Sequence, residues 1–140
     1  MVEMPQEPGG SAPPAEGRLK LGIVFYTPPS TSHFTLGIEL AKAALRRGYD
    51  VQAFAWGDSV YATNVSDEGK AIEGSAPSEI ARLIGEVGSG GPRFTISACT
   101  SCRKLRGMSQ GNAVPGVRLG GLHDVVKMSQ ECHRMLVLVP

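Results

Sequence analysis

Short apolar runs separated by amphipathic segments constrain the fold of this chain more than any other feature. The runs at 19–27 (LKLGIVFYT), 49–57 (YDVQAFAWG) and 93–99 (RFTISAC) are too short for buried helices and rich in β-forming residues, so each predicts a strand. The run at 133–140 (HRMLVLVP) predicts a final buried strand. Strands that alternate with helices imply right-handed crossovers and a mostly parallel sheet.

The segments between these runs carry helical patterns. Within residues 30–48, apolar side chains recur every three or four positions and mark one helical face: Phe34, Ile38, Ala41 and Leu45. The stretch from Ser30 to Ser32 supplies an N-cap, and Gly48 ends this helix. A second helix is predicted from Pro77 to about Val87, where a glycine-rich breaker follows.

The remaining connections complete the predicted fold. The polar stretch at 59–77 predicts mostly loop, a short helix is expected directly after Cys99, and a last helix is expected from about Leu119 to Cys132. The sequence therefore predicts a three-layer α/β fold. Its mostly parallel sheet has about four to five strands, with helices on both faces.

Composition and charge exclude several classes of protein. Residues 1–17 are rich in Pro, Gly, Ala and Glu and predict a flexible tail before one domain at 18–140. A net charge of +1 gives no broad electrostatic footprint for nucleic acid. No secretory leader is apparent, and no apolar stretch approaches the length of a membrane helix. The 3 cysteines are too few for a disulfide scaffold, which favours a reducing, cytoplasmic setting.

Three loops are expected to share one edge of the predicted sheet. They are TPPSTSH (27–33), WGDSVY (56–61) and CTSC (99–102), and each follows a strand. Ligands collect beyond the carboxyl ends of parallel strands, so this edge is the predicted functional site. His33 and Asp58 are candidate residues on this rim, and an apolar patch around VYATNV or Trp56 would suit an oligomer contact.

Cys99 is the candidate nucleophile on that rim. It is expected at a strand end and a helix start, where backbone amides and the helix dipole favour a thiolate. Arg103, Lys104 and Arg106 add positive charge, although bases in a first helical turn oppose the dipole. These bases would stabilise an anionic sulfur or bind an acidic surface of a partner protein. The alternative is that they form only the solvated face of a short helix.

Cys102 leaves several interpretations open. It lies one helical turn after Cys99, a spacing that permits a disulfide and matches a thioredoxin-like C-x-x-C motif. A zinc site would need Cys132 and either His123 or His133 as further ligands. Their spacing is unlike a second zinc knuckle, so no metal is expected. Cys132 itself reads as a small apolar residue packed between the last helix and strand.

Three stretches together resemble the DsrE/DsrF-like sulfur-relay family, which includes the TusD-type subunits. They are HFTLGIELAKAALRRGYDVQAFAWGDSVYA, CTSCRKLRGM and GVRLGGLHDVVKMSQECHRMLVL. The resemblance implies a small α/β subunit of a trimer or hexamer, often with paralogous subunits. It also implies a cysteine that carries sulfane sulfur as a persulfide. The Arg106-Gly107 pair aligns that cysteine with Cys99, while Cys102 stands where the family more often has a small apolar residue.

The resemblance therefore implies a sulfurtransferase that accepts sulfur on Cys99 and passes it to an acceptor protein cysteine, without a cofactor. Its partners would be sulfur donor and acceptor proteins. Cys102 would be a second carrier, a resolving thiol or half of a redox pair. A dithiol switch through Cys99 and Cys102 and a non-catalytic subunit of a hetero-oligomer are the alternatives. The fold by itself does not decide between them, because some family members lack the cysteine.

Overall fold

The computed structural model describes residues 17–65, 72–86 and 90–139. Within them, five parallel strands form one sheet in the order β4-β3-β2-β1-β5, where β1 is Lys20–Phe25, β2 Asp50–Ala55, β3 Phe94–Cys99, β4 Arg118–Gly120 and β5 Arg134–Leu138. The predicted parallel α/β sheet is confirmed. The predicted tail lies outside the described residues except for Gly17.

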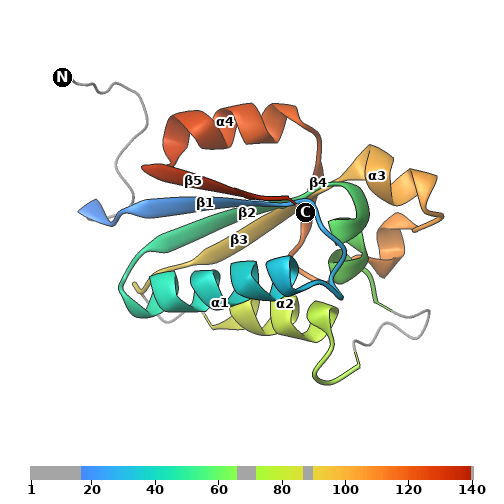
Figure 1. Cartoon of the computed structure of the whole chain (residues 1–140), viewed down its shortest axis with the longest axis horizontal. Coiled ribbons are helices and arrows are strands. Elements are labelled where there is room, and N and C mark those ends of the chain that lie inside the picture. Colours follow the sequence, from blue (N-terminus) through green and yellow to red (C-terminus); the bar gives the residue numbers. More distant parts are fainter. Residues whose placement is uncertain (1–16, 66–71, 87–89, 140) are drawn as a thin grey trace.

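Helices cover both faces of the sheet (Figure 1). The helices α1 (Ser32–Arg46) and α2 (Ala76–Gly85) lie on one face, and α4 (His123–Glu131) lies on the other. This arrangement follows from right-handed crossovers. The chain moves from β1 to β3 in one direction across the sheet, and it then crosses from the β4 edge back to β5 at the opposite edge. The short helix α3 (Thr100–Leu105) projects beyond the carboxyl end of β3.

The ends of α1 show why this segment forms a helix of this length. The hydroxyl of Thr31 accepts a hydrogen bond from the Phe34 amide at 3.2 Å, inside the predicted cap region. At the other end, Gly48 has φ +88° and the amide of Tyr49 reaches back to the Ala44 carbonyl. Together with the Gly48 amide bond to Leu45, this is a Schellman motif, which ends the helix as predicted.

Two predicted segments differ in the structure. The supposed loop after β2 is partly a 3₁₀ helix, η2 (Gly57–Thr63), and its side chains Ser59, Val60, Ala62 and Thr63 are buried. The supposed helix start at Leu119 belongs to β4, because Leu119 pairs with Ala98 of β3; α4 begins only at His123. In both segments tertiary packing overrides the local pattern. The rest of the predicted loop, 66–71, and Val87 lie outside the described residues.

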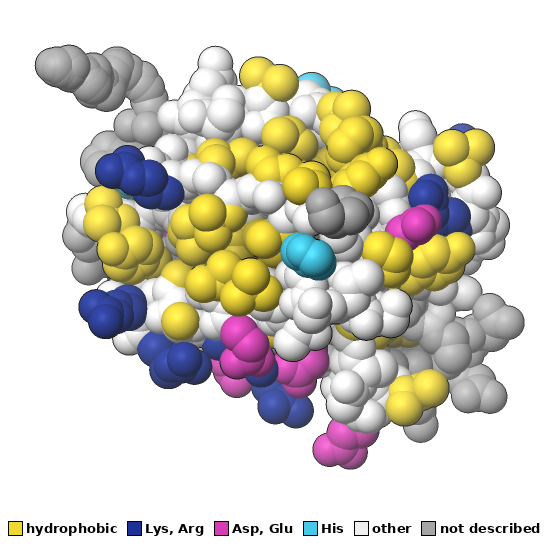
Figure 2. Space-filling view, in the orientation of Figure 1, with side chains coloured by type: hydrophobic (Ala, Val, Ile, Leu, Met, Phe, Trp, Pro, Cys, Tyr) yellow, Lys and Arg dark blue, Asp and Glu magenta, His cyan; other side chains and the backbone are white. Residues whose placement is uncertain are grey.

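The predicted last strand forms, but the prediction that it is buried is wrong. The strand β5 is an edge strand, and Val137 is 58% exposed while Leu138 is buried against α1. Gly37 of α1 allows this approach, because a Cβ there would overlap the side chains of Leu138 and Phe25. Figure 2 shows hydrophobic side chains gathered over the middle of this face of the molecule. An apolar run in the sequence does not show whether the helices of the same chain will cover the strand or leave it exposed to solvent.

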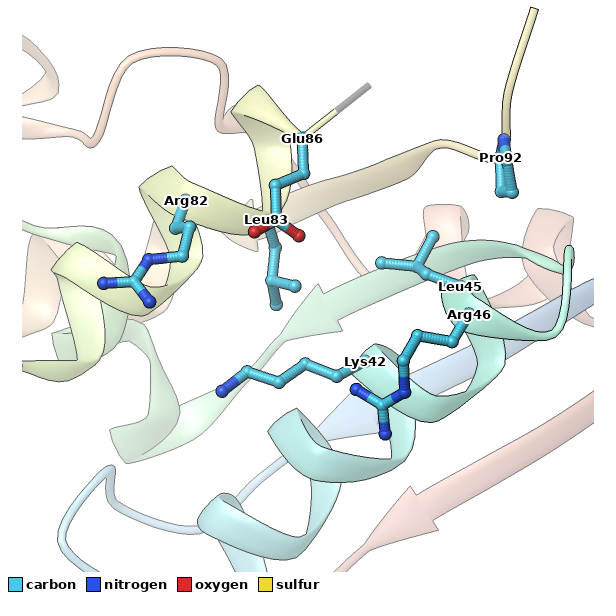
Figure 3. Close-up of a pocket in the computed structure, with 7 residues that line it drawn as sticks. All are labelled: Lys42, Leu45, Arg46, Arg82, Leu83, Glu86 and Pro92. Atoms are coloured by element: carbon cyan, nitrogen blue, oxygen red, sulfur yellow. The ribbon is translucent and has the colours of Figure 1, made fainter. Parts of the chain in front are cut away.

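A groove of about 460 Å³ lies between α1 and α2, where Figure 3 shows Lys42, Leu45 and Arg46 facing Arg82, Leu83 and Glu86. Both helices run antiparallel to the strands, so the groove between their C-terminal ends lies at the amino-terminal ends of the strands. It is therefore at the far end from the predicted rim. At its edge Lys42 pairs with Glu79 at 2.8 Å and joins the two helices.

The Lys42–Glu79 pair predicts a pH-dependent loss of stability. The hydrogen bond from Lys42 lowers the pKa of the Glu79 carboxyl. The pair therefore stabilises the fold at pH values above the usual pKa of glutamate, and this stabilisation is lost as acid protonates Glu79. Glu79→Gln should lower the free energy of unfolding near pH 7 by at most about 1 kcal/mol.

Urea unfolding at a series of pH values measures this difference. The difference in free energy of unfolding between Glu79→Gln and the wild type should disappear as the pH falls below the usual pKa of glutamate. Glu39→Gln, which alters only the more exposed partner of Lys42, should show a smaller difference near pH 7. A difference that stays constant into acid would refute the assignment.

Candidate functional site

The parallel register brings the carboxyl ends of β1, β2 and β3 side by side, as predicted, and we call this end of the sheet, with the loops that follow these strands, the rim. Phe25 pairs with Ala55, and Ala55 pairs with Ala98, one residue before Cys99. The roof over these strand ends is η2, since the hydroxyl of Ser59 donates to the carbonyls of Phe25 and Trp56, both at 2.8 Å. Cys99 thus ends its strand at a closed rim rather than in open solvent.

Cys99 is the N-cap residue of α3. Its backbone is extended, as a cap residue requires, and its Sγ accepts a hydrogen bond from the Cys102 amide at 3.4 Å. The residue is only 6% exposed. Cys99 therefore lies where the sequence predicts it, at the end of a strand and the start of a helix, but it is more buried than expected.

Cys102 lies one helical turn after Cys99 on α3 and is also buried, at 8% exposure. Its Sγ accepts a hydrogen bond from the Gly57 amide at 3.3 Å, which connects α3 to the start of η2. Burial raises the pKa of the Cys102 thiol, and its hydrogen bond with the Cys99 sulfur raises that pKa further. The Gly57 amide and the charge of Arg106 act in the opposite direction. Both cysteines are free thiols in this structure.

Sequence reasoning missed Gly57 as a site residue. It has φ +65°, a conformation that side chains with a Cβ rarely adopt. A Cβ there would also lie 3.0 Å from the ring of Tyr26. Tyr26 stacks on Trp56 with ring centroids 4.7 Å apart, and both rings are partly exposed. The glycine-aspartate turn after the second strand was the signal for this position.

Arg103 does not face either sulfur. It is 2% exposed, and its guanidinium donates four hydrogen bonds, to the Thr63 carbonyl and hydroxyl, the Asn64 side-chain oxygen and the Ser109 carbonyl, at 2.7–3.3 Å. Burial lowers the pKa of this guanidinium, and no carboxylate among the described residues offsets its charge. Arg103 therefore holds α3 against the end of η2, a structural position that its sequence pattern did not reveal.

Arg106 lies nearer to the thiols than Arg103, but an acid partly neutralises it. Its Nε and Nη2 donate to one oxygen of Asp58 at 2.9 and 2.7 Å, and its Nη1 donates to the Cys102 carbonyl at 3.0 Å. Asp58 therefore belongs to the cysteine cluster through Arg106. This contact also raises the pKa of the Arg106 guanidinium.

The other predicted rim residues stand apart from this cluster. Lys104 is exposed on α3. His33 is exposed on the first turn of α1, with no hydrogen-bond or ion-pair partner among the described residues. The VYATNV segment does not form the expected apolar patch, because Val60, Ala62 and Val65 belong to the core; Trp56 and Tyr61 are exposed.

The opposite edge of the sheet holds the third cysteine. Cys132 packs between α4 and β5, with its Sγ 3.9 Å from the Gln52 side-chain oxygen. Burial raises the pKa of this thiol to about 11. Within residues 17–65, 72–86 and 90–139, no group of three or more His, Cys, Asp or Glu side chains is placed to hold a metal ion.

The comparison with protein families decides the family of this chain. A model of the DsrE/DsrF-like family matches residues 19–138. The chain belongs to this family. The family is associated with sulfur relay in general. No curated protein gives a significant match to the sequence.

Solved structures share this fold at low sequence identity. The ychN protein from E. coli aligns with a TM-score of 0.67 and 16% identity, over 86% of this chain and 98% of its own. MTH1491 from Methanobacterium thermoautotrophicum gives 0.65 and 14%, over 84% and 98%. BT1422 from Bacteroides thetaiotaomicron gives 0.57 and 20%, over 84% and 93%. At these identities the likeness shows the DsrE-like fold alone.

The position of Arg103 predicts a large loss of stability when it is replaced. Arg103→Met keeps apolar bulk but leaves the acceptors of Thr63, Asn64 and Ser109 without their donor. The free energy of unfolding should fall by about 2–4 kcal/mol, because buried acceptors without partners are costly.

Lys104→Met is the matched control, since Lys104 is the exposed neighbour on the same helix. Its free energy of unfolding, measured by urea titration, should stay within about 0.5 kcal/mol of the wild type. Equal losses in the two variants would show that the guanidinium does not anchor α3.

Proposed function

We propose that this protein is a sulfur carrier that accepts sulfane sulfur as a persulfide on Cys99 and passes it to a cysteine of an acceptor protein. The observation that carries the proposal is the place of Cys99, at the end of β3 on the rim, with its Sγ accepting the Cys102 amide. Membership of a family associated with sulfur relay supports the same chemistry.

The proposed transfer is a thiol exchange at sulfur. The Cys99 thiolate attacks the outer sulfur of a donor persulfide, a new sulfur–sulfur bond forms, and the donor leaves as a thiolate. An acceptor thiolate then attacks the outer sulfur on Cys99 in the same way. The exchange itself uses no cofactor. Before any sulfur is bound, Cys99 Sγ already accepts a hydrogen bond from the Cys102 amide at 3.4 Å.

Partner proteins would dock on the exposed part of α3. Lys104 presents a charge to solvent there, and Leu105 is 84% exposed. Next to the thiols, the Arg106–Asp58 pair offers one cation that is only partly neutralised. We propose that an acidic, partly apolar face of the donor or acceptor docks on this helix, in a reducing cytoplasmic setting where both thiols stay free.

Sulfur loading tests the proposal directly. When the reduced protein is incubated with inorganic polysulfide, its intact mass should rise by one sulfur atom, and a thiol reductant should remove the gain. Cys99→Ser should not gain mass. Cys132→Ser should load as the wild type does, because Cys132 lies at the other edge of the sheet and burial raises its pKa to about 11.

Loading that persists in Cys99→Ser and disappears in Cys102→Ser would move the carrier role to Cys102. A wild type that forms a disulfide without releasing sulfide, together with a Cys102→Ser variant that gains no sulfur, would favour a dithiol switch. Absence of both reactions would favour a non-catalytic subunit.

We further propose that copies of this chain, or of a paralogue, associate through the β5 edge. This edge strand has no neighbour on its outer side among the described residues, and Leu136 and Val137 are exposed on it. Val126 of α4 is a further exposed apolar side chain. An exposed apolar edge strand is a ready surface for pairing with another chain.

A charge on this strand should break the association. Val137→Asp places a carboxylate on the exposed edge, where desolvating it against a second copy is unfavourable. Sedimentation velocity should show the wild type as an oligomer and Val137→Asp shifted to a smaller species. Thr95→Asp, a change of the same charge on an exposed residue of β3, should leave the oligomer intact. A wild type that sediments as a monomer, or an unchanged Val137→Asp, would contradict the proposal.

A further inference from the structure

The two rim cysteines are arranged as a reacting pair. Cys99 caps α3, the Cys102 amide donates to Cys99 Sγ at 3.4 Å, and the Cys102 thiol is itself within hydrogen-bonding reach of that sulfur. Because the residues are one helical turn apart at a helix start, a disulfide between them needs little movement of the backbone. The same spacing at a helix start is typical of dithiol oxidoreductases.

We propose that Cys102 resolves the Cys99 persulfide and releases its outer sulfur as hydrogen sulfide. This inference rests on the proposed loading of Cys99. It adds a second outcome to the relay: the carried sulfur either passes to an acceptor protein or leaves the protein as sulfide.

The step balances without another reactant. The Cys102 sulfur attacks the inner sulfur of the persulfide, which is Cys99 Sγ. The bond between Sγ and the outer sulfur breaks, and a Cys99–Cys102 disulfide forms. The outer sulfur takes the electron pair of the broken bond and the proton of the Cys102 thiol, so it is reduced to sulfide while the Cys102 sulfur is oxidised. A small dithiol, or two molecules of a monothiol, then reduces the disulfide and restores both thiols.

The surroundings of Cys102 suit this internal role better than a role as the first acceptor. Its sulfur is buried against the start of η2, where the Gly57 amide donates to it at 3.3 Å. Burial and the hydrogen bond with the Cys99 sulfur raise the pKa of the Cys102 thiol, so it stays protonated until it attacks, and the Gly57 amide and the charge of Arg106 act in the opposite direction. Since both thiols are less than one-tenth exposed, a neighbouring sulfur has a large advantage over dissolved thiols in reaching Cys99.

Cys132 is not an alternative resolving thiol. It lies at the amino end of β5, whereas Cys99 lies at the carboxyl end of β3, so the length of the sheet separates them. Cys132→Ser is therefore a matched control that removes one thiol and leaves the pair intact.

The experiment follows the loaded protein after the donor is removed. The wild type, Cys102→Ser, Cys102→Ala and Cys132→Ser are loaded with inorganic polysulfide, desalted and left without reductant. Sulfide is trapped with a bimane reagent while intact mass is recorded. In the wild type and in Cys132→Ser, the added sulfur should be lost as the mass falls to two hydrogens below the reduced protein, with one sulfide released per disulfide formed.

Both Cys102 variants should keep the added sulfur at least about tenfold longer and should form no disulfide. The single tryptophan, Trp56, precedes the Gly57 amide that binds Cys102 Sγ, so its fluorescence in each variant reports whether the rim remains folded. Folded Cys102 variants that lose the sulfur as fast as the wild type, with equal release of sulfide, would overturn the resolving role while leaving the carrier proposal intact. Failure of the Cys102 variants, which cannot resolve a persulfide, to load at all would instead overturn the carrier proposal.

Discussion

The buried guanidinium of Arg103 fixes the position of everything at the rim. A buried charge is costly unless hydrogen bonds surround it, and here four neutral acceptor contacts do so, from Thr63, Asn64 and Ser109. These bonds fasten the six-residue helix α3 to the end of η2. A helix this short has little stability of its own, so the position of both thiols depends on this anchor.

The enclosed rim sets the chemistry that the two thiols can perform. Cys99 lies at the end of β3, where its sulfur accepts a hydrogen bond from the Cys102 amide, and the Cys102 sulfur in turn accepts one from the Gly57 amide. Low exposure limits competing reactions with solutes, and the neighbouring thiol remains in reach. Burial raises the pKa of the Cys102 thiol, and the charge of Arg106, which is paired with Asp58, acts in the opposite direction.

The parallel α/β sheet, the caps of α1 and the position of Cys99 at the end of β3 were predictable from sequence, because each depends on a local pattern that the fold preserves. The role of Arg103 was not predictable. Its basic neighbours in the sequence suggest one charged face, whereas its two Thr63 acceptors lie 40 positions away, at the end of η2. The exposure of β5 was hidden for a related reason, since an apolar run does not show which chain covers it.

Mapping the carried sulfur to one residue tests the central claim most directly. After brief exposure to polysulfide, alkylation and trypsin digestion, the peptide from Phe94 to Arg103 contains both rim cysteines and fragments between them. The account predicts the additional sulfur on Cys99 at the earliest times, before any disulfide forms. Sulfur found first on Cys102, or on Cys132, would contradict it.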